Sequence, residues 1–149
     1  MSNDFWKGYL VASMISILSI LCIGSIAHCD TQMTNLIRKE AISQGFDPEI
    51  AIAIATIESG LNPRAIGPKK EVGLFQILPR FSPVPRIALF DPKVNARVGI
   101  EKLIEAQKKC RVNKNLTYVI CFNNGLSRKP NHPLLHPYYK RFLIAWRNL

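Results

Sequence analysis

Residues 47–60 carry the clearest helix signal in this sequence, and they limit the folds that are open to the chain. Asp47 is a good N-cap, Pro48 suits the first turn, and Gly60 is a typical residue at a helix end. Between these signals, residues 50–57 are apolar except for one threonine. Because a helix that is apolar nearly all round must be covered by its neighbours, we expect a domain built around this central helix.

The rest of the chain is also predicted to be mainly helical, apart from one long loop. Residues 61–90 contain five prolines, so they cannot form one long helix. We expect a structured Pro/Gly-rich loop there, and a small hairpin at 67–77 is an option. The predicted fold class is all-α, or α+β at most. Further helices are expected from Asp30 or Thr31 to Gly45, from Asp91-Pro92 to about Lys109, from Leu116 to Phe122, and over Tyr138, Phe142, Leu143 and Trp146.

Residues 1–29 are predicted to direct export rather than to join the folded domain at 30–149. Lys7 precedes an uncharged, largely apolar stretch, and Ser25-Ile26-Ala27 has the small residues of a cleavage site. The stretch is also close to the length that spans a bilayer, so a cleaved signal peptide and a retained membrane anchor both remain open. In either case this segment meets the inner membrane, and the domain is periplasmic or anchored facing the periplasm.

The chain is strongly basic, with 20 Lys and Arg against 10 Asp and Glu and a formal net charge of +10. A basic surface favours an anionic partner. Export favours cell-wall polymer or phospholipid headgroups, and no basic helix with interleaved aromatic residues supports nucleic-acid binding. Nucleic acid is therefore not an expected partner. A solvated basic surface without a specific partner is the alternative.

The cysteines suggest a disulfide rather than a metal site. Cys110 and Cys121 fall on neighbouring predicted helices, and an oxidising compartment would allow them to form a bridge. Two buried free thiols are the alternative. No CxxC motif or His/Cys cluster is present, so no metal is predicted.

Glu58 is the unusual residue of the central helix. It lies four residues after Ile54 and seven after Ala51, which places it on or beside the buried stripe. Desolvation should raise its pKa, so that it keeps a proton near neutral pH and can donate it to a leaving group. The alternative is a structural carboxylate that pairs with Arg64 or Lys69.

Four sequence blocks follow one another after the central helix begins. They read IESGLNPRAIG at 57–67, GLFQILP at 73–79, DPKVN at 91–95 and CFNNG at 121–125. Together they resemble the soluble-type lytic transglycosylase (SLT) domain of the lysozyme-like superfamily, over residues 36–143. The resemblance implies a compact, helical, lysozyme-like domain that cleaves the glycan strands of bacterial peptidoglycan.

The resemblance also implies roles for the residues of the first two blocks. Glu58 matches the family's catalytic acid/base, and Ser59 is expected to support the geometry beside it. Gln76 matches a glutamine that contacts the sugar. Phe75 stands where the family has methionine, and we expect it to line the same groove.

The resemblance also implies roles for residues nearer the end of the chain. Asn123 matches the asparagine of the last block, and Phe122 stands where the family usually has tyrosine, so it can pack on a sugar or in the core. The family's late tyrosine, which orients the catalytic glutamate, best matches Tyr138. Tyr139 is the alternative.

The resemblance implies one catalytic carboxyl group, and we therefore expect a reaction that uses no water, metal or cofactor. Glu58 would protonate the glycosidic oxygen, and the C6 hydroxyl of N-acetylmuramic acid would then close a 1,6-anhydro ring. If Glu71 supplies a second carboxylate instead of lying in a solvated loop, the enzyme would hydrolyse the bond as a lysozyme does. A non-catalytic wall-binding component is the other alternative. We expect local wall opening, for a secretion, conjugation or phage machine that crosses the envelope.

Overall fold

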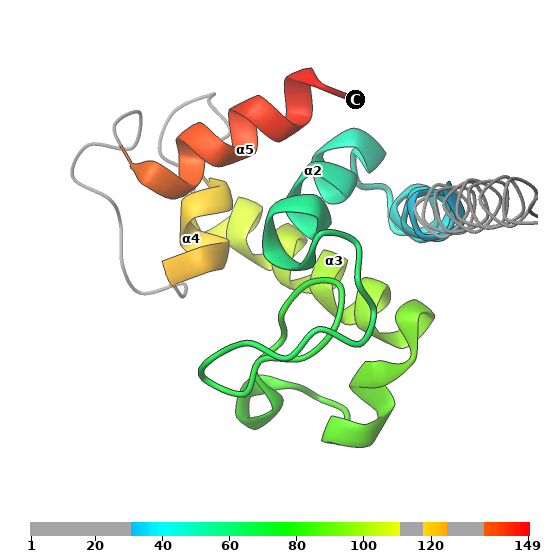
Figure 1. Cartoon of the computed structure of the whole chain (residues 1–149). Helices are drawn as coiled ribbons and strands as arrows, with labels where there is room; N and C mark the ends of the chain where they lie inside the picture. Colours follow the sequence, from blue (N-terminus) through cyan, green and yellow to red (C-terminus); the bar gives the residue numbers. More distant parts are fainter. Residues whose placement is uncertain (1–30, 111–117, 125–135) are drawn as a thin grey trace, which may run out of the picture. The chain divides into compact units, whose positions relative to one another are not determined.

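The computed structural model describes residues 31–110, 118–124 and 136–149 (Figure 1). The chain divides into two compact units, Met1–Met33 and Thr34–Leu149, and the second holds the domain discussed here. Residues 31–43 are helical and precede, in order, α2 (Pro48–Ser59), η1 (Pro79–Phe81), η2 (Arg86–Phe90), α3 (Pro92–Lys109), α4 (Tyr118–Asn124) and α5 (Pro137–Arg147).

The described residues contain helices and two isolated β-bridges, which confirms the predicted all-α class. None of the helices in these residues is both long and apolar enough to cross a membrane. The predictions for residues 1–29, and the start of the helix expected at 116, lie outside the described residues.

Helix α2 has the caps that its sequence predicts. The Asp47 carboxylate accepts hydrogen bonds from the backbone N–H groups of Glu49 and Ile50, at 2.9 and 3.3 Å. Gly60 ends the helix in the left-handed region with φ of 60°. All residues from 50 to 55 are buried, and α2 packs against α5 (Figure 1). The helix is therefore the central element of the domain, as predicted.

Helix α3 anchors the long loop through one buried side chain, Asn95. Its amide is fully buried; Oδ1 accepts from the backbone N–H of Phe75, and Nδ2 donates to the carbonyls of Val72 and Leu89. These three bonds measure 2.8–2.9 Å. Gly73, with φ of 76°, has no space for a Cβ atom against this amide. The loop thus owes its position to a side chain from another element.

The loop itself folds back on its own chain. Antiparallel bridges join Val72 to both Ile66 and Ile77, so three short segments lie side by side. Ser59, at the end of α2, donates from Oγ to the carbonyl of Leu74 at 2.9 Å. The small hairpin expected at 67–77 is present in this reduced form, and the loop is tied to α2 as well as to α3.

Helices α3 and α4 are joined covalently. Cys110 ends α3, Cys121 lies in α4, and a disulfide links them with their Cα atoms 6.5 Å apart. The sequence left open whether these two cysteines pair, and the structure has the bridge. Figure 1 shows α4 beside the end of α3 and below the start of α5, and it contacts both helices.

Candidate active site

Glu58 and Tyr138 form the centre of the candidate site. Glu58 lies in the last turn of α2, where its side chain is half-buried. Tyr138, only 3% exposed in the first turn of α5, donates a hydrogen bond from its hydroxyl to Glu58 Oε1 at 2.6 Å. The packing of α5 on α2 brings these two residues together. Tyr139, the alternative that the sequence left open, is also buried, but its ring packs near Phe142.

The surroundings of Glu58 raise its pKa above the ordinary value. Burial is the main cause, because it disfavours the charged form. The hydrogen bond from Tyr138 and the positive charge of Arg141 act in the opposite direction, and the negative charge of Glu71 adds to the rise. Burial and the nearby carboxylate also raise the pKa of Tyr138 well above its usual range. Tyr138 therefore remains a hydrogen-bond donor at neutral pH.

Arg141 belongs to the site although the sequence reasoning missed it. It is exposed on α5, three residues after Tyr138, and its guanidinium carbon lies 5.7 Å from the centre of the Tyr138 ring. The sequence feature that could have indicated Arg141 is its i, i+3 spacing from Tyr138, which places the two side chains on one helix face. The structural alternative for Glu58, an ion pair with Arg64 or Lys69, is not formed: among the described residues no Lys or Arg lies within ion-pair distance of it.

Gln76 has an unusual backbone conformation that aims its side chain at the loop. Its φ of 46° lies in the left-handed region, which is uncommon outside glycine. Nε2 donates to the carbonyl of Gly73 at 2.9 Å, while Oε1 accepts no hydrogen bond in the part of the chain that the structure describes. The amide nitrogen is thus used to fix the side chain. The amide oxygen is left as a hydrogen-bond acceptor without a partner among the described residues.

Glu71 lies beside Gln76 rather than at a free loop tip. Its Oε2 accepts from the backbone N–H of Lys69 at 2.8 Å. A Cβ atom at Gly67 would come within 2.6 Å of Glu71 Oε2 and 2.5 Å of Gln76 Oε1, so both side chains pack over this glycine. The charge of Glu71 also acts on Glu58. The loop therefore brings a second carboxylate to the neighbourhood of the first.

Phe75 does not line the groove, so that prediction is wrong. Its side chain is 1% exposed and packs on Gly99 of α3, where a Cβ atom would overlap the ring. The space for the ring comes from a glycine 24 residues later, and the local sequence around Phe75 does not reveal it. Phe75 is therefore a residue of the core.

Phe122 and Asn123 lie on α4, half-buried and exposed respectively. No hydrogen bond joins Asn123 to Glu58, Gln76 or Tyr138 within the described residues. Their proposed contacts with substrate stay predictions. No group of His, Cys, Asp or Glu in the described ranges has a metal-binding arrangement.

A carboxyl whose pKa is raised by burial can act as a general acid, and general-acid catalysis can break a glycosidic bond. The fold and the site together thus define an enzyme of the lysozyme-like class. The transglycosylase SLT domain family matches residues 35–133, more than half of the chain, and the protein belongs to this family of lytic transglycosylases, glycan-cleaving lyases whose substrate is peptidoglycan. A search of curated proteins gave no match.

Proposed function

We propose that Glu58 acts first as the acid and then as the base in cleavage of the β-1,4 bond between N-acetylmuramic acid and N-acetylglucosamine. The observation that carries the proposal is the half-buried Glu58 carboxyl with its raised pKa, held at Oε1 by Tyr138. The raised pKa favours the protonated form that can act as the acid, and the carboxylate becomes a base as soon as it has given up its proton.

The reaction balances without water. Glu58 transfers its proton to the glycosidic oxygen, the bond from that oxygen to muramic acid C1 breaks, and N-acetylglucosamine leaves with a free hydroxyl. The acetamido group of the muramic acid stabilises the positive charge at C1. The C6 hydroxyl then attacks C1 and returns its proton to Glu58, which gives a 1,6-anhydro ring and regenerates the acid.

The neighbouring residues orient this chemistry. Tyr138 holds Oε1, so we assign proton transfer to Oε2, which accepts no hydrogen bond from the described residues. The free amide oxygen of Gln76 is suited to the acetamido N–H of a bound sugar. Arg141 stabilises the Glu58 carboxylate that forms after the first proton transfer.

Product analysis tests the proposal. The full chain is incubated with purified peptidoglycan, and the soluble muropeptides are weighed; 1,6-anhydro ends are lighter than reducing ends by one water molecule. We expect anhydro ends from the wild type and none from Glu58→Gln, which preserves the shape of the side chain. Wall cleavage that survives in Glu58→Gln contradicts the role of Glu58. A wild type that binds the wall without cutting it supports the non-catalytic alternative.

Hydrolysis is the second candidate, because Glu71 lies over Gly67 and its charge reaches Glu58. Two carboxylates could divide the work between acid and nucleophile or base. Reducing ends in the products, together with inactivity of Glu71→Gln, favour this candidate. Anhydro ends that persist in Glu71→Gln exclude it.

We also propose that the enzyme acts outside the inner membrane, opening the wall locally for a machine that crosses the envelope. The support is the apolar stretch after Lys7, the small residues at 25–27 and the basic charge of the chain. Cell fractionation followed by mass measurement of the N-terminus tests the export. A chain that starts at Met1 and stays in the cytoplasm contradicts it.

A further inference from the structure

A pocket of about 410 Å³ opens on the long loop, and four of its six lining residues are basic. The lining residues are Lys69, Lys70, Leu78, Pro79, Arg80 and Arg86. This volume is within the range that holds a small organic ligand. No acidic residue lines the pocket, so its charge favours an anion.

The positive charges of this basic pocket are not neutralised by the described protein. The ion pairs of the described residues are Arg38–Glu49 and Lys109–Glu105, and neither involves the pocket. The nearest carboxylate in sequence, Glu71, is turned to the backbone of Lys69 and to Gly67. Four unpaired cations around one cavity repel one another, and a bound anion would relieve that repulsion.

The loop holds the pocket in shape before a ligand arrives. Arg86 Nη1 donates to the carbonyl of Lys70 at 3.0 Å, which ties η2 to the preceding turn. Lys70 closes that turn through its N–H to the carbonyl of Gly67, with a left-handed φ of 69°. The Arg80 guanidinium lies 4.7 Å from the centre of the Phe81 ring. Such preorganisation lowers the entropy that binding would otherwise cost.

The pocket and the candidate active site share one piece of chain. Lys70 precedes Glu71, and Leu78 follows Gln76 by two residues. The bridges that join Ile66, Val72 and Ile77 hold these segments side by side. A ligand that places a sugar at Gln76 therefore has its neighbouring groups within reach of the basic pocket.

We propose that this pocket binds the carboxylates of the peptide stem that peptidoglycan carries on its muramic acid residues. This inference rests on the proposed function and names the form of the strand that the enzyme prefers. The glycan itself is nearly uncharged once its lactyl groups are joined to peptide, whereas the stem bears free carboxylates. Lysine and arginine bind carboxylates through charge-assisted hydrogen bonds, and Leu78 and Pro79 give apolar contact to the methyl groups of alanine.

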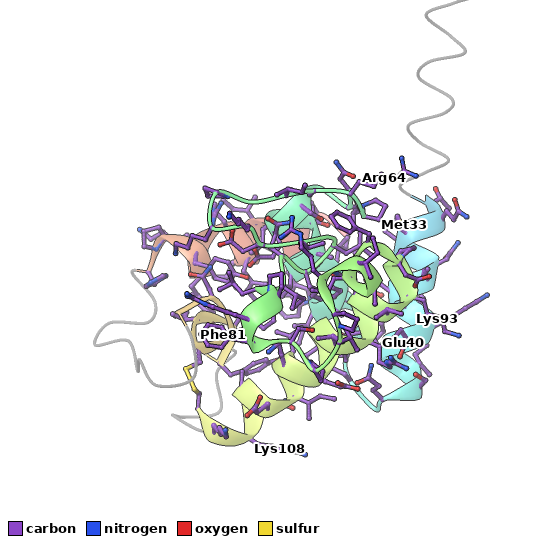
Figure 2. The ribbon with its side chains drawn as sticks, turned by 90° about the horizontal axis from the view of Figure 1, so that it is seen from below. Met33, Glu40, Arg64, Phe81, Lys93 and Lys108 are labelled. Carbon is purple, nitrogen blue, oxygen red and sulfur yellow. A yellow bond between two sulfur atoms is a disulfide. The ribbon has the colours of Figure 1, made fainter. Side chains whose placement is uncertain are left out.

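The test compares two strands and two double variants of the full chain. Lys69→Gln/Arg80→Gln removes two pocket charges from side chains that make no hydrogen bond among the described residues. Lys93→Gln/Lys108→Gln removes two charges from the exposed surface of α3, where Figure 2 labels both residues, and neither of them lines the pocket. Both are assayed on strands whose peptide stems keep their carboxylates and on strands whose stem carboxylates have been converted to amides.

We expect the pocket variant to have a KM at least roughly tenfold higher on strands with free stem carboxylates, with kcat unchanged, and wild-type values on the amidated strands. The surface variant should match the wild type on both. An equal loss on both strands, or no loss on either, overturns the proposal.

A binding measurement separates this proposal from the proposed function. Glu58→Gln chain is titrated with a soluble stem tripeptide by calorimetry, with and without the two pocket substitutions. Binding that the substitutions abolish supports the pocket even if no strand is ever cleaved. Absence of binding, or binding of anionic phospholipid vesicles that the pocket substitutions abolish while tripeptide binding persists, contradicts it.

Discussion

Tyr138 and Glu58 are 80 positions apart in the sequence, yet the phenol hydroxyl of one donates to the carboxylate of the other at 2.6 Å. The bond connects the first turn of α5 with the last turn of α2. It opposes the effect of burial on the Glu58 pKa, because a donor stabilises the charged carboxylate. The acidity of Glu58 therefore depends on the packing of two helices.

Replacing Tyr138 with Phe should lower activity and move its pH dependence. Loss of a hydrogen bond to a charged group costs about 1.5–3 kcal/mol, so we expect kcat/KM to fall roughly tenfold to a hundredfold. The Glu58 pKa rises further once the donor is gone, and activity that needs protonated Glu58 then persists to higher pH. The kcat/KM profile against pH measures both effects.

Tyr139→Phe is the matched control, since it removes the neighbouring hydroxyl from the same helix turn. Its profile should overlay that of the wild type. If Tyr138→Phe shifts the alkaline limb towards lower pH, the hydrogen bond does not act on Glu58 as described.

Glu58 should also make the stability of the domain depend on pH. Its pKa is higher in the folded state, so the folded state binds more protons than the unfolded state between the two pKa values. The stabilising contribution of protonated Glu58 is complete below the unfolded pKa and is lost as the pH rises through the folded pKa. Urea unfolding of wild type and Glu58→Gln across this window should give a difference that grows with pH in favour of Glu58→Gln. A flat difference contradicts the raised pKa.

Asn95→Ala should be one of the most damaging single changes in the domain. It leaves one N–H and two carbonyl groups of the loop buried without their partners. We expect the free energy of unfolding to fall by about 3 kcal/mol or more. Asn148→Ala, near the exposed C-terminus, should change it by less than about 0.5 kcal/mol in the same urea titration. Equal values for the two variants would mean that the buried amide contributes little.

Gly99→Ala tests the contact between Gly99 and Phe75 by whether it raises or lowers the free energy of unfolding. In an unobstructed helix interior, alanine is more stable than glycine by about 1 kcal/mol. Here the added methyl overlaps the Phe75 ring, so we expect a loss of about 1–3 kcal/mol instead. In a Phe75→Met background, the flexible side chain can move aside and the loss should shrink. A double-mutant cycle of unfolding free energies measures this coupling, and simple additivity would contradict the contact.

The sequence predicts the helices better than it predicts the loop, for a physical reason. Caps such as Asp47 and Gly60 act within a few residues of the helix ends that they set, so local signals locate α2. Asn95 looks like an ordinary polar residue in the first turns of α3, and only the tertiary fold shows that it is buried. The conformation of the loop depends on such distant partners.

The candidate site also has residues that local sequence signals predict and residues that depend on distant partners. The position of Glu58 follows from helix periodicity, but Phe75 was misassigned because the space for its ring is provided by Gly99. The basic pocket was also missed, since its residues come from three separate stretches of the loop. The positive residues were visible in the sequence only as net charge, which does not report where charges converge.

Helix α3 has two attachments. Asn95, near the start of α3, holds the long loop, and Cys110, at the end of α3, is bonded to α4. Cys110 follows Asn95 by fifteen positions, which is about 22 Å along the axis at 1.5 Å per residue. One inserted residue between them would turn one attachment by about 100° relative to the other. The length of α3 is therefore under strict constraint, and natural variation in chain length should accumulate in the connections outside this helix.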